Sequence, residues 1–548
     1  MEGKKATLAT NTEGQKVIKI SFPYDLDIIK EIRELPGRKY HKDLRCWSAP
    51  IFPKTVNELI KLGFTVDEKI TNMISGHSAK LEKIMTDGVD GLKRQLRPFQ
   101  SQGVTKIDIF KGRALLADEM GLGKTIMALA WLQMHKDLRP VIVVVPSNVK
   151  INWMREAKLW MTNPNVEILS GETPWKPSGS ILVINYEVLH HWVLTLRRQH
   201  AKVLICDEAH YIKSNKARRT KAVRKLAKGI DYIQFLTGTP IENRPIEMFN
   251  MLNILYPEIF PNWFFYGKRY CKGKNNGFGW DFSGHSHEDE LHNKLINTCM
   301  IRRLKKDVLK ELPDKIPSFL PFEIDNQKEY EYAEKHFIQY IRALKGDKAA
   351  MKAKKVEQMA SLESLKQLAV KGKLKQSIAW IQDFIESGEK LVVFATHHIV
   401  VDALMEEFKG MAVQLDGRVT SDIARQKAVD DFQLNPDIKI FVGNIKAAGK
   451  AITLTAASNV AILELPWTPG ALKQAIDRVH RMGQLKGVNV WYHLALNTVE
   501  ERLVRILETK QKVSTSVVDG GEMQNEDEVF SELINEYLKE ADGSYKSN

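Results

Sequence analysis

The segment Asp118–Thr125, D-E-M-G-L-G-K-T, constrains the fold more than any other part of this chain. It follows a short apolar run, Ala114–Ala117, which predicts the end of a strand, and it precedes the amphipathic run Ile126–His135, which predicts a helix. A glycine-bearing turn between a strand and a helix start binds phosphate chains, because backbone N–H groups close around anionic oxygens. We therefore expect a phosphate-binding loop, although Asp118 stands where the usual pattern has its first glycine.

The residue types of this loop suit a nucleotide and its metal ion. Lys124 is placed to reach the β- and γ-phosphates of ATP, and Thr125 to offer a hydroxyl to Mg²⁺. Taken alone, the segment also fits a turn that merely ends in Lys-Thr. The predicted ATP-binding residues of the loop are Asp118, Glu119, Met120, Gly121, Leu122, Gly123, Lys124 and Thr125.

A second motif, D-E-A-H at Asp207–His210, follows the apolar run Val203–Cys206. Ligands bind at the carboxyl ends of parallel strands, so Asp207 is expected to hold Mg²⁺ together with Thr125. Glu208 is expected to orient or deprotonate the attacking water, and His210 to couple the nucleotide state to a second lobe. The alternative is an acidic pair on a solvated helix, which is common, but rarely at the end of a buried strand.

Three further segments have a possible role at this site. Gln100, in L-R-P-F-Q, is suited to the adenine edge, which a glutamine amide can contact in bidentate fashion. Leu236–Pro240, L-T-G-T-P, offers Thr237 and Thr239 to the acidic motif or to hydrated Mg²⁺, or it is a plain strand-to-turn segment. Met300–Val308, M-I-R-R-L-K-K-D-V, either touches phosphates or forms a solvated helix face.

Unbroken apolar runs indicate an α/β fold, because strands buried on both faces of a parallel sheet show no alternation. Two clusters of such runs flank a long helical middle, which predicts two tandem RecA-like lobes with parallel sheets, preceded by a small α+β module. We expect a disordered tail at 1–14, the module at 15–70, a linker at 71–91, the ATP-binding lobe at 92–325, a helical bridge at 326–385 and the second lobe at 386–548. The second lobe ends in a docking helix at Val529–Leu538.

The composition of the chain limits the kinds of partner that it can bind. The 548 residues carry a net charge of +14, which suits a polyanion such as nucleic acid. No stretch approaches the roughly 20 apolar residues of a membrane span, so no membrane partner is expected. The N-terminus lacks the apolar core of a signal peptide. The four cysteines form no C-x-x-C pair, which disfavours zinc and fits a reducing compartment.

The second lobe contains D-R-V-H-R-M-G-Q, in which Arg478 and Arg481 lie three residues apart. That spacing predicts one helix face. A planar guanidinium suits a γ-phosphate oxygen, so both arginines are candidate catalytic residues that reach the nucleotide when the lobes close. A basic helix face without chemistry is the alternative.

This motif series resembles superfamily two helicases, and specifically the Swi/Snf branch of double-stranded DNA translocases. The resemblance runs from about residue 92 to 512 and rests on L-R-P-F-Q, D-E-M-G-L-G-K-T, P-S-N-V-K-I-N-W, D-E-A-H, L-T-G-T-P, L-D-G-R, W-T-P-G and D-R-V-H-R-M-G-Q. It implies ATP-driven tracking along duplex DNA without unwinding, and DNA contacts from Pro146, Asn148, Tyr186, Thr396, Thr453 and Trp467. Ala448 and Ala451 depart from the glycines usual in the loop that holds Thr453.

The N-terminal segment has a resemblance of its own. F-P-Y at 22–24, Leu35-Pro36, Arg38, Tyr40, and Arg45 with Trp47 resemble the HARP domain of eukaryotic annealing helicases. This resemblance implies a DNA-binding module that recognises the substrate, with Trp47 among its contacts. The alternative is a small structural cap.

Together these features predict an ATP-dependent duplex-DNA translocase that anneals or remodels branched or forked DNA, with ATP and Mg²⁺ as cofactors. A strand-separating helicase and a protein-displacing remodeller with the same motor are the alternatives, and an RNA target is open because phosphate contacts carry no base information. A nearly minimal motor suits a bacterial or phage source, hence a cytoplasmic, nucleoid-associated protein, or a nuclear one if the source is eukaryotic. Protein partners are unknown.

Overall fold

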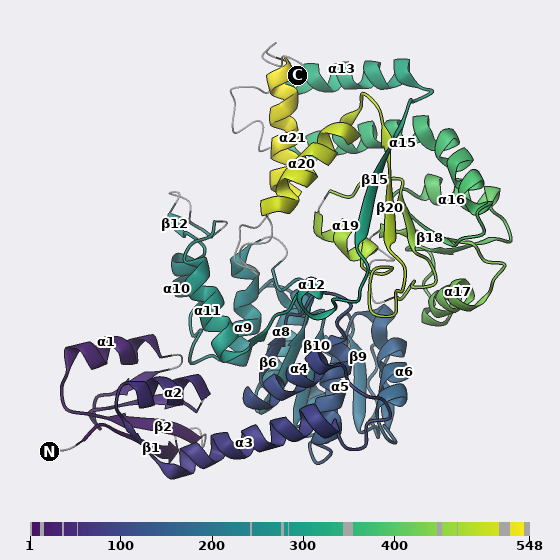
Figure 1. The fold of residues 1–548 in the computed structure, drawn as a ribbon. Helices are drawn as coiled ribbons and strands as arrows, with labels where there is room; N and C mark the ends of the chain where they lie inside the picture. Colours follow the sequence, from purple (N-terminus) through teal and green to yellow (C-terminus); the bar gives the residue numbers. More distant parts are fainter. Residues whose placement is uncertain are drawn as a thin grey trace. The chain divides into compact units, whose positions relative to one another are not determined.

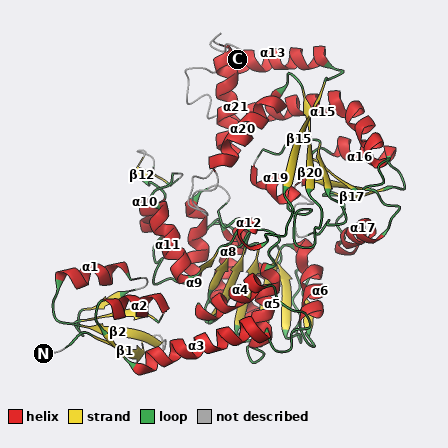
Figure 2. Cartoon of the chain, viewed as in Figure 1, coloured by secondary structure: helices red, strands yellow, loops and turns green. Residues whose placement is uncertain are grey.

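The computed structural model describes residues 3–10, 16–35, 38–51, 53–241, 244–275, 279–282, 284–343, 354–445, 452–467, 469–513 and 526–541 (Figure 1). The chain divides into two compact units, the first formed by 1–119 with 123–304, and the second by 305–548 with the short segment 120–122. Both contain a parallel sheet with helices, which Figure 2 shows by secondary structure, and this confirms the predicted α/β class.

The first unit begins with a small five-stranded sheet of order β3-β4-β2-β1-β5. Ile18 and Ile20 alternate along β2 and are buried, as the period of two requires. Its strands are β1 (Lys5–Thr10), β2 (Lys16–Ser21), β3 (Lys39–His41), β4 (Cys46–Pro50) and β5 (Thr65–Val66), and its helices are α1 (Leu26–Glu34), α2 (Pro53–Lys61) and α3 (Glu68–Asp87). The predicted α+β module is confirmed, but the expected disordered tail is wrong for residues 5–10, because β1 pairs with both β2 and β5.

The large sheet of the first unit has the order β14-β6-β11-β10-β7-β9-β8, and all its pairs are parallel. Strands such as β7 and β10 coincide with or extend fully buried apolar runs, which is typical of strands covered on both faces. The strands are β6 (Ala114–Leu116), β7 (Val141–Val145), β8 (Val166–Ile168), β9 (Ile181–Asn185), β10 (Val203–Asp207), β11 (Tyr232–Leu236) and β14 (Met300–Ile301).

Helices and a small hairpin complete this unit. The helices are α4 (Pro98–Ile109), α5 (Lys124–Met134), α6 (Lys150–Trp160), α7 (Leu189–Arg197), α8 (Arg218–Ala227), α9 (Phe249–Leu255), α10 (Trp263–Tyr270) and α11 (Glu288–Thr298), with short 3₁₀ turns η1 (Ser147–Val149), η2 (Ala209–Ile212) and η3 (Pro245–Met248). The hairpin is β12 (Lys274–Asn275) with β13 (Trp280–Asp281). Figure 1 shows β12 beside α10.

The second unit has a six-stranded parallel sheet of order β15-β20-β19-β16-β18-β17. Its strands are β15 (Lys315–Phe322), β16 (Leu391–Ala395), β17 (Ala412–Leu415), β18 (Ile440–Asn444), β19 (Asn459–Ile462) and β20 (Val488–Ala495). β15 carries Pro317 and Pro321, which an edge strand tolerates because a proline cannot donate to the ladder. The predicted lobe boundary at 325 is therefore wrong: the unit begins at 305, and β15 pairs with β20.

The helical middle belongs to this second unit rather than bridging two lobes. Tyr330 of α13 and Leu362 of α15 are buried in the same apolar core as the strand residue Val460. The tail helix packs there as predicted, through residues such as Val529 and Tyr537. The helices are α12 (Lys305–Val308), α13 (Gln327–Ala343), α15 (Lys355–Ile385), α16 (His398–Glu407), α17 (Asp422–Leu434), α19 (Pro469–Ile476), α20 (Val499–Val513) and α21 (Glu526–Ala541).

No helix in the described residues is both long and apolar enough to cross a bilayer. The four cysteines are buried free thiols.

Candidate active site

The phosphate loop lies where the sequence predicts it, between β6 and α5. Gly121 and Gly123 have φ angles of 83° and 79°, a left-handed backbone that glycine adopts without steric cost. The Lys124 ammonium donates to the carbonyl oxygen of Asp118 at 2.8 Å. Burial lowers the pKa of Lys124, while Glu208, Asp118 and Asp207 act in the opposite direction. The lysine and both acids of the second motif thus share one electrostatic environment.

Asp118 does more than replace a glycine. Its side chain is fully buried, and the Arg303 Nε donates to its Oδ1 at 3.0 Å, while a second guanidinium nitrogen pairs with Oδ2. The Arg303 guanidinium also lies 5.5 Å from the centre of the Phe99 ring. A fork-to-carboxylate pair fixes both partners in orientation. The basic segment at 300–308 is therefore not a solvated helix face at Arg303, because this residue anchors the base of the loop.

The acidic pair lies at the carboxyl end of β10. Trp153 donates its indole N–H to Asp207 Oδ2 at 2.8 Å, and Tyr186 donates its hydroxyl to the Asp207 carbonyl oxygen at 2.8 Å. Glu208 has a left-handed backbone, φ 48° and ψ 52°, which is costly for a non-glycine residue and concentrates at functional sites. Burial, reinforced by the adjacent Glu208, raises the pKa of Asp207 to about 6.

The sheet order explains how the L-T-G-T-P motif takes part. β11 lies between β6 and β10, so its end separates the phosphate loop from the acidic pair. His210 Nδ1 lies 3.3 Å from Thr237 Oγ1, which confirms that a threonine of this motif bonds the acidic motif. Thr237 Oγ1 also accepts from the Thr239 N–H at 3.2 Å.

Gln100 is buried in the first turn of α4. Its side-chain oxygen accepts from the Arg97 N–H at 3.0 Å, which caps the helix. Its contact with adenine stays a prediction.

The predicted DNA contacts of the first unit occupy different environments. Pro146 is buried after β7, and Trp47 is half-buried. Tyr186 is 1% exposed and stacks on Tyr211, with ring centres 5.2 Å apart. This ring has no surface to offer to DNA, and its hydroxyl instead holds the backbone of the acidic motif. The side chain of Asn148 lies outside the part of the structure that is described.

In the second unit, the helix predicted to carry both arginines ends too early. α19 stops at Ile476, and residues 477–479 form a turn, so Arg478 and Arg481 do not share a helix face. Asp477, the first residue of that turn, is buried and pairs with Lys305 at 2.9 Å and Lys315 at 2.7 Å. Arg481 donates to Thr453 Oγ1 at 2.8 Å. Action of either arginine on a nucleotide stays a prediction.

Thr396 and Trp467, two more predicted DNA contacts, lie at the ends of one charged network. Glu464 Oε2 accepts from the Thr396 N–H at 2.6 Å, and the Trp467 indole donates to Glu363 Oε2 at 2.8 Å. His397 joins these acids, with Nε2 2.9 Å from Glu363 Oε1 and Nδ1 bonded to Glu464. These bonds raise the pKa of His397 to about 9, and they lower that of Glu363 to about 2. Residues 446–451, including Ala448 and Ala451, lie outside the described residues.

Sequence reasoning missed three residues that shape these sites. Arg303 and Glu363 lie in segments to which no fixed role was assigned, and Trp153 was noted only as part of a motif. For Trp153 the signal is its place in P-S-N-V-K-I-N-W. The pairing of Arg303 with Asp118 has no local signal, because 184 intervening residues separate the two.

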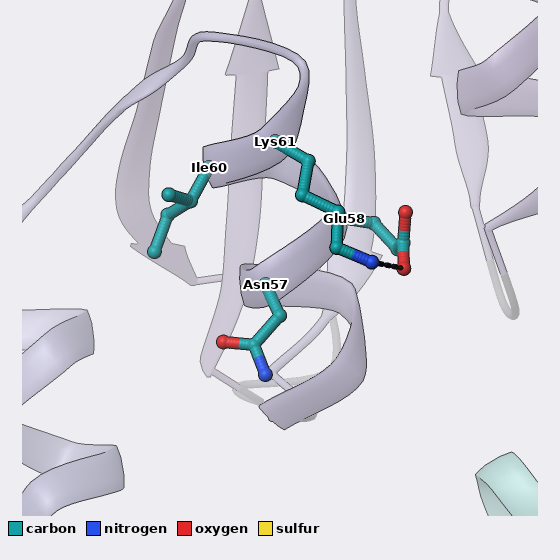
Figure 3. A pocket seen from close by; sticks show the side chains of 4 residues that line it. All are labelled: Asn57, Glu58, Ile60 and Lys61. Carbon is teal, nitrogen blue, oxygen red and sulfur yellow. Dashed lines mark hydrogen bonds and ion pairs between the residues drawn. The ribbon is translucent and has the colours of Figure 1, made fainter.

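A shallow hollow on α2 of the N-terminal module is lined by Asn57, Glu58, Ile60 and Lys61 (Figure 3). Its one ion pair, Lys61 Nζ to Glu58 Oε1 at 2.9 Å, lies on an exposed helix face. The carboxylate and the ammonium of this hollow are paired with each other, and the phosphate loop lies elsewhere, so we do not assign the reaction to the hollow.

The fold and the first unit's site define a class: nucleotide hydrolases built on RecA-like lobes. Two family models match, the SNF2-related domain at residues 104–376 and the helicase conserved C-terminal domain at 372–483. A Caenorhabditis elegans relative, "SWI/SNF-related matrix-associated actin-dependent regulator of chromatin subfamily A-like protein 1 homolog", is 31% identical over 90% of this chain and 74% of its own length. The chain belongs to this SNF2-related helicase family.

Two further matches extend this result. The mouse protein "DNA annealing helicase and endonuclease ZRANB3" is 34% identical over 79% of this chain, and the match spans 41% of the mouse protein. The Sulfolobus solfataricus SWI2/SNF2 ATPase core, solved in complex with dsDNA, is 25% identical over 82% of this chain and 97% of its own, with a TM-score of 0.38. The two relatives named here, from mouse and Caenorhabditis elegans, give no support to a bacterial or phage source.

Proposed function

We propose that this protein is a DNA-dependent ATPase that moves along duplex DNA and anneals or remodels branched DNA. The observation that carries the proposal is the meeting of a phosphate loop and an acidic pair at the carboxyl edge of one sheet. Lys124 begins the helix after β6 and Asp207 ends β10, and these two strands are not neighbours, yet each residue perturbs the pKa of the other. Such mutual perturbation in a site of this shape is typical of catalytic groups.

Each residue of this site has a role in hydrolysis. Loop N–H groups and the N-terminus of α5 bind the phosphates, and Lys124 neutralises their charge. Glu208, positioned next to Asp207 by its left-handed backbone, orients the attacking water and accepts its proton. Trp153 and Tyr186 hold Asp207 in place through the two hydrogen bonds described above. Arg478 and Arg481 act from the second unit when it closes on the nucleotide.

Mg²⁺ fits the same residues. The hydroxyl of Thr125 and the carboxylate of Asp207 are the hard oxygen ligands that Mg²⁺ prefers. Burial and the adjacent Glu208 raise the pKa of Asp207, and a divalent cation would relieve the repulsion between the two carboxylates. Among the described residues no group of three or more His, Cys, Asp or Glu could hold a metal alone, so the ion would be shared with the nucleotide phosphates. When bound, it would neutralise charge that develops on those phosphates.

The DNA substrate is inferred from charge, family and surface chemistry. A net charge of +14 suits a polyanion, and relatives of this chain carry the name of annealing helicases. On the N-terminal sheet, Tyr40 of β3 faces Trp47 of β4, with ring centres 5.1 Å apart. This aromatic pair, of which Tyr40 is 47% exposed, is the surface on which the module would read branched DNA. The protein would then act where chromosomal DNA lies: the nucleus of a eukaryote, or the nucleoid.

The test is steady-state ATP hydrolysis by the full chain with single-stranded, duplex and forked DNA. Duplex and forked DNA should stimulate turnover, and Lys124→Ala should abolish it, while Lys136→Ala, a change at an exposed lysine of the same lobe, should not. Trp47→Ala should remove any preference for forks over duplex. ATP hydrolysis that ignores all DNA would refute the proposal, and stronger stimulation by RNA would overturn the substrate.

A further inference from the structure

The first unit contains a pocket of about 560 Å³ that the proposed function does not use. It is lined by residues 213–216, which follow η2 and the acidic motif in the chain. Residues of α8 and η3 and the first residue of α10 complete the lining. Three of its side chains are lysines, and none is acidic. The aromatic–lysine pocket is lined by Lys213, Ser214, Asn215, Lys216, Lys221, Ile246 and Trp263.

The charge of this pocket calls for an anion. Lys216 and Lys221 are exposed, and no acidic group in the described part of the chain lies within ion-pair distance of either. The Nζ atom of Lys213 lies 4.0 Å from a carboxylate oxygen of Glu247. Ser214 and Asn215 add neutral hydrogen-bond donors. Several cations beside neutral donors are the usual surroundings of a nucleic acid backbone.

Trp263 supplies an aromatic ring to the lining of the pocket, and this residue is 41% exposed. This ring is held edge-on against Phe282, with ring centres 4.7 Å apart and an interplanar angle of 89°. Gly267 makes room for Phe282, because a Cβ at that position would lie 2.6 Å from the Phe282 ring. The Trp263 ring is therefore a fixed platform rather than a loose surface side chain.

The neighbouring aromatic residues have the same character. Trp280 of β13 is 41% exposed and packs edge-on against Phe264, with ring centres 4.8 Å apart. The Lys268 ammonium lies 5.6 Å from the centre of the Trp280 ring. Packing of an apolar core does not require two half-exposed tryptophans with lysines around them. Binding of nucleic acid bases does, because the bases stack on exposed aromatic rings.

We propose that the aromatic–lysine pocket binds an unpaired DNA strand, with phosphates on Lys213, Lys216 and Lys221 and a base stacked on Trp263. A duplex does not fit this chemistry, because its bases are already stacked on one another and expose no face to a protein ring. The inference rests on the proposed function, since a remodeller of branched DNA meets unpaired strands at the junction. It gives the first lobe a contact for the strand that annealing would bring back into the duplex.

The test uses the full chain and two labelled probes, a 20-nucleotide thymidine strand and a 20-base-pair duplex, with binding followed by fluorescence anisotropy. Trp263→Ala should weaken single-strand binding about 5- to 150-fold, the range for loss of one stacked base. Duplex binding should change less than twofold. Trp263→Phe should restore most of the single-strand affinity. Phe265→Ala, at a 68% exposed aromatic on the same helix but outside the pocket, is the matched control and should change neither.

The lysines give an independent readout that folding defects would not imitate. In Lys216→Gln/Lys221→Gln, the slope of log affinity against log salt for the single strand should fall by about 1.4, since two phosphate contacts are lost. A 2-aminopurine placed in the strand should be quenched by the wild-type protein and by Trp263→Phe, and not by Trp263→Ala.

Equal losses for both probes in Trp263→Ala would overturn the proposal, as would unchanged single-strand affinity or tighter Trp263-dependent binding of a uridine strand. The two hypotheses fail separately. ATP hydrolysis that ignores duplex DNA, with Trp263-dependent strand binding intact, would refute the motor and leave the pocket. Duplex-stimulated hydrolysis with strand binding independent of Trp263 would do the reverse.

Discussion

Two buried acids, Asp207 of the first unit and Asp477 of the second, have pKa values that are shifted in opposite directions. In the first, burial and the adjacent Glu208 raise the pKa of Asp207 to about 6, and burial lowers the pKa of Lys124. In the second, Asp477 is also buried, but Lys315 and Lys305 outweigh its desolvation and hold its pKa well below the usual range. The charge of Asp207 is thus opposed by its burial and by Glu208, while two lysines neutralise the charge of Asp477.

This difference distinguishes an acid that takes part in the reaction from an acid that stabilises the fold. Groups that oppose one another in a buried site store electrostatic free energy that a ligand can release, which is why perturbed pKa values collect at functional sites. A carboxylate between two lysines has nothing left to gain from a ligand, and it fixes the chain instead. By this criterion the first unit holds the reaction, and the second positions the arginines that follow Asp477.

The largest expected effect tests whether the second unit also takes part in the reaction. Arg481→Ala should lower kcat for ATP hydrolysis by about 10³- to 10⁵-fold, the contribution of an arginine finger, and leave ATP binding nearly intact. Arg481→Lys keeps the charge but loses the planar fork, so it should recover only part of the rate. Steady-state kinetics and nucleotide titration measure both. If Arg481→Ala left kcat unchanged, the second unit would have only a structural role.

The acid that orients water in the first unit should come next. Glu208→Gln should retain ATP binding and lower turnover by about 10²- to 10⁴-fold, because the amide cannot accept the proton of the attacking water. Glu172→Gln, at an exposed acid of the same unit, is the control. Single-turnover kinetics measure the effect, and normal turnover in Glu208→Gln would move the base elsewhere.

Loss of the paired acid Asp477 should lower the stability of the second unit. Asp477→Ala leaves Lys305 buried without its carboxylate, and removal of one partner of a buried pair costs about 3 to 5 kcal/mol. Hydrogen exchange of amides in β15 and β20 should accelerate accordingly, whereas the exposed Asp437→Ala should change unfolding free energy by less than about 0.5 kcal/mol. Unaltered exchange would show that the two lysines do not depend on Asp477.

The smallest expected effect is a pH dependence of the second unit. The folded pKa of His397, about 9, lies above its ordinary 6.5, so this stabilisation is complete below pH 6.5 and is lost as pH rises through 9. The folded pKa of Glu363, about 2, lies below its ordinary 4.5, so its contribution is present above pH 4.5 and is lost as pH falls through 2. Stability from this pair should therefore be greatest between pH 4.5 and 6.5.

Glu363→Gln should flatten the alkaline side of that profile, by about 1 to 2 kcal/mol between pH 6.5 and 9, since solvent screens a half-buried pair. Denaturant midpoints of the second unit across pH measure it. An unchanged profile in Glu363→Gln would leave Glu464 as the sole partner of His397.

Much of the fold follows from local sequence. Val141–Val145 and Leu391–Ala395 are unbroken apolar runs in the sequence and form strands with these same bounds, because a run of apolar residues buried on both faces is typical of a parallel sheet. The phosphate loop and D-E-A-H were predicted on the same ground, since each follows such a run directly. Residues 5–10 were not predicted as a strand because they are ordered by pairing with β2 on one side and β5 on the other. Nothing in their own pattern indicates these partners.

Sequence by itself determined the chemistry of each strand end, the two-lobed plan and the order of the motifs, because these depend on residues close together in the chain. Only the tertiary structure decided that Arg303 anchors Asp118, that α19 ends at Ile476, and that β15 joins the second sheet. The physical reason is common to all three. A buried charge or an open strand edge must find a partner, and the partner can come from anywhere in the chain.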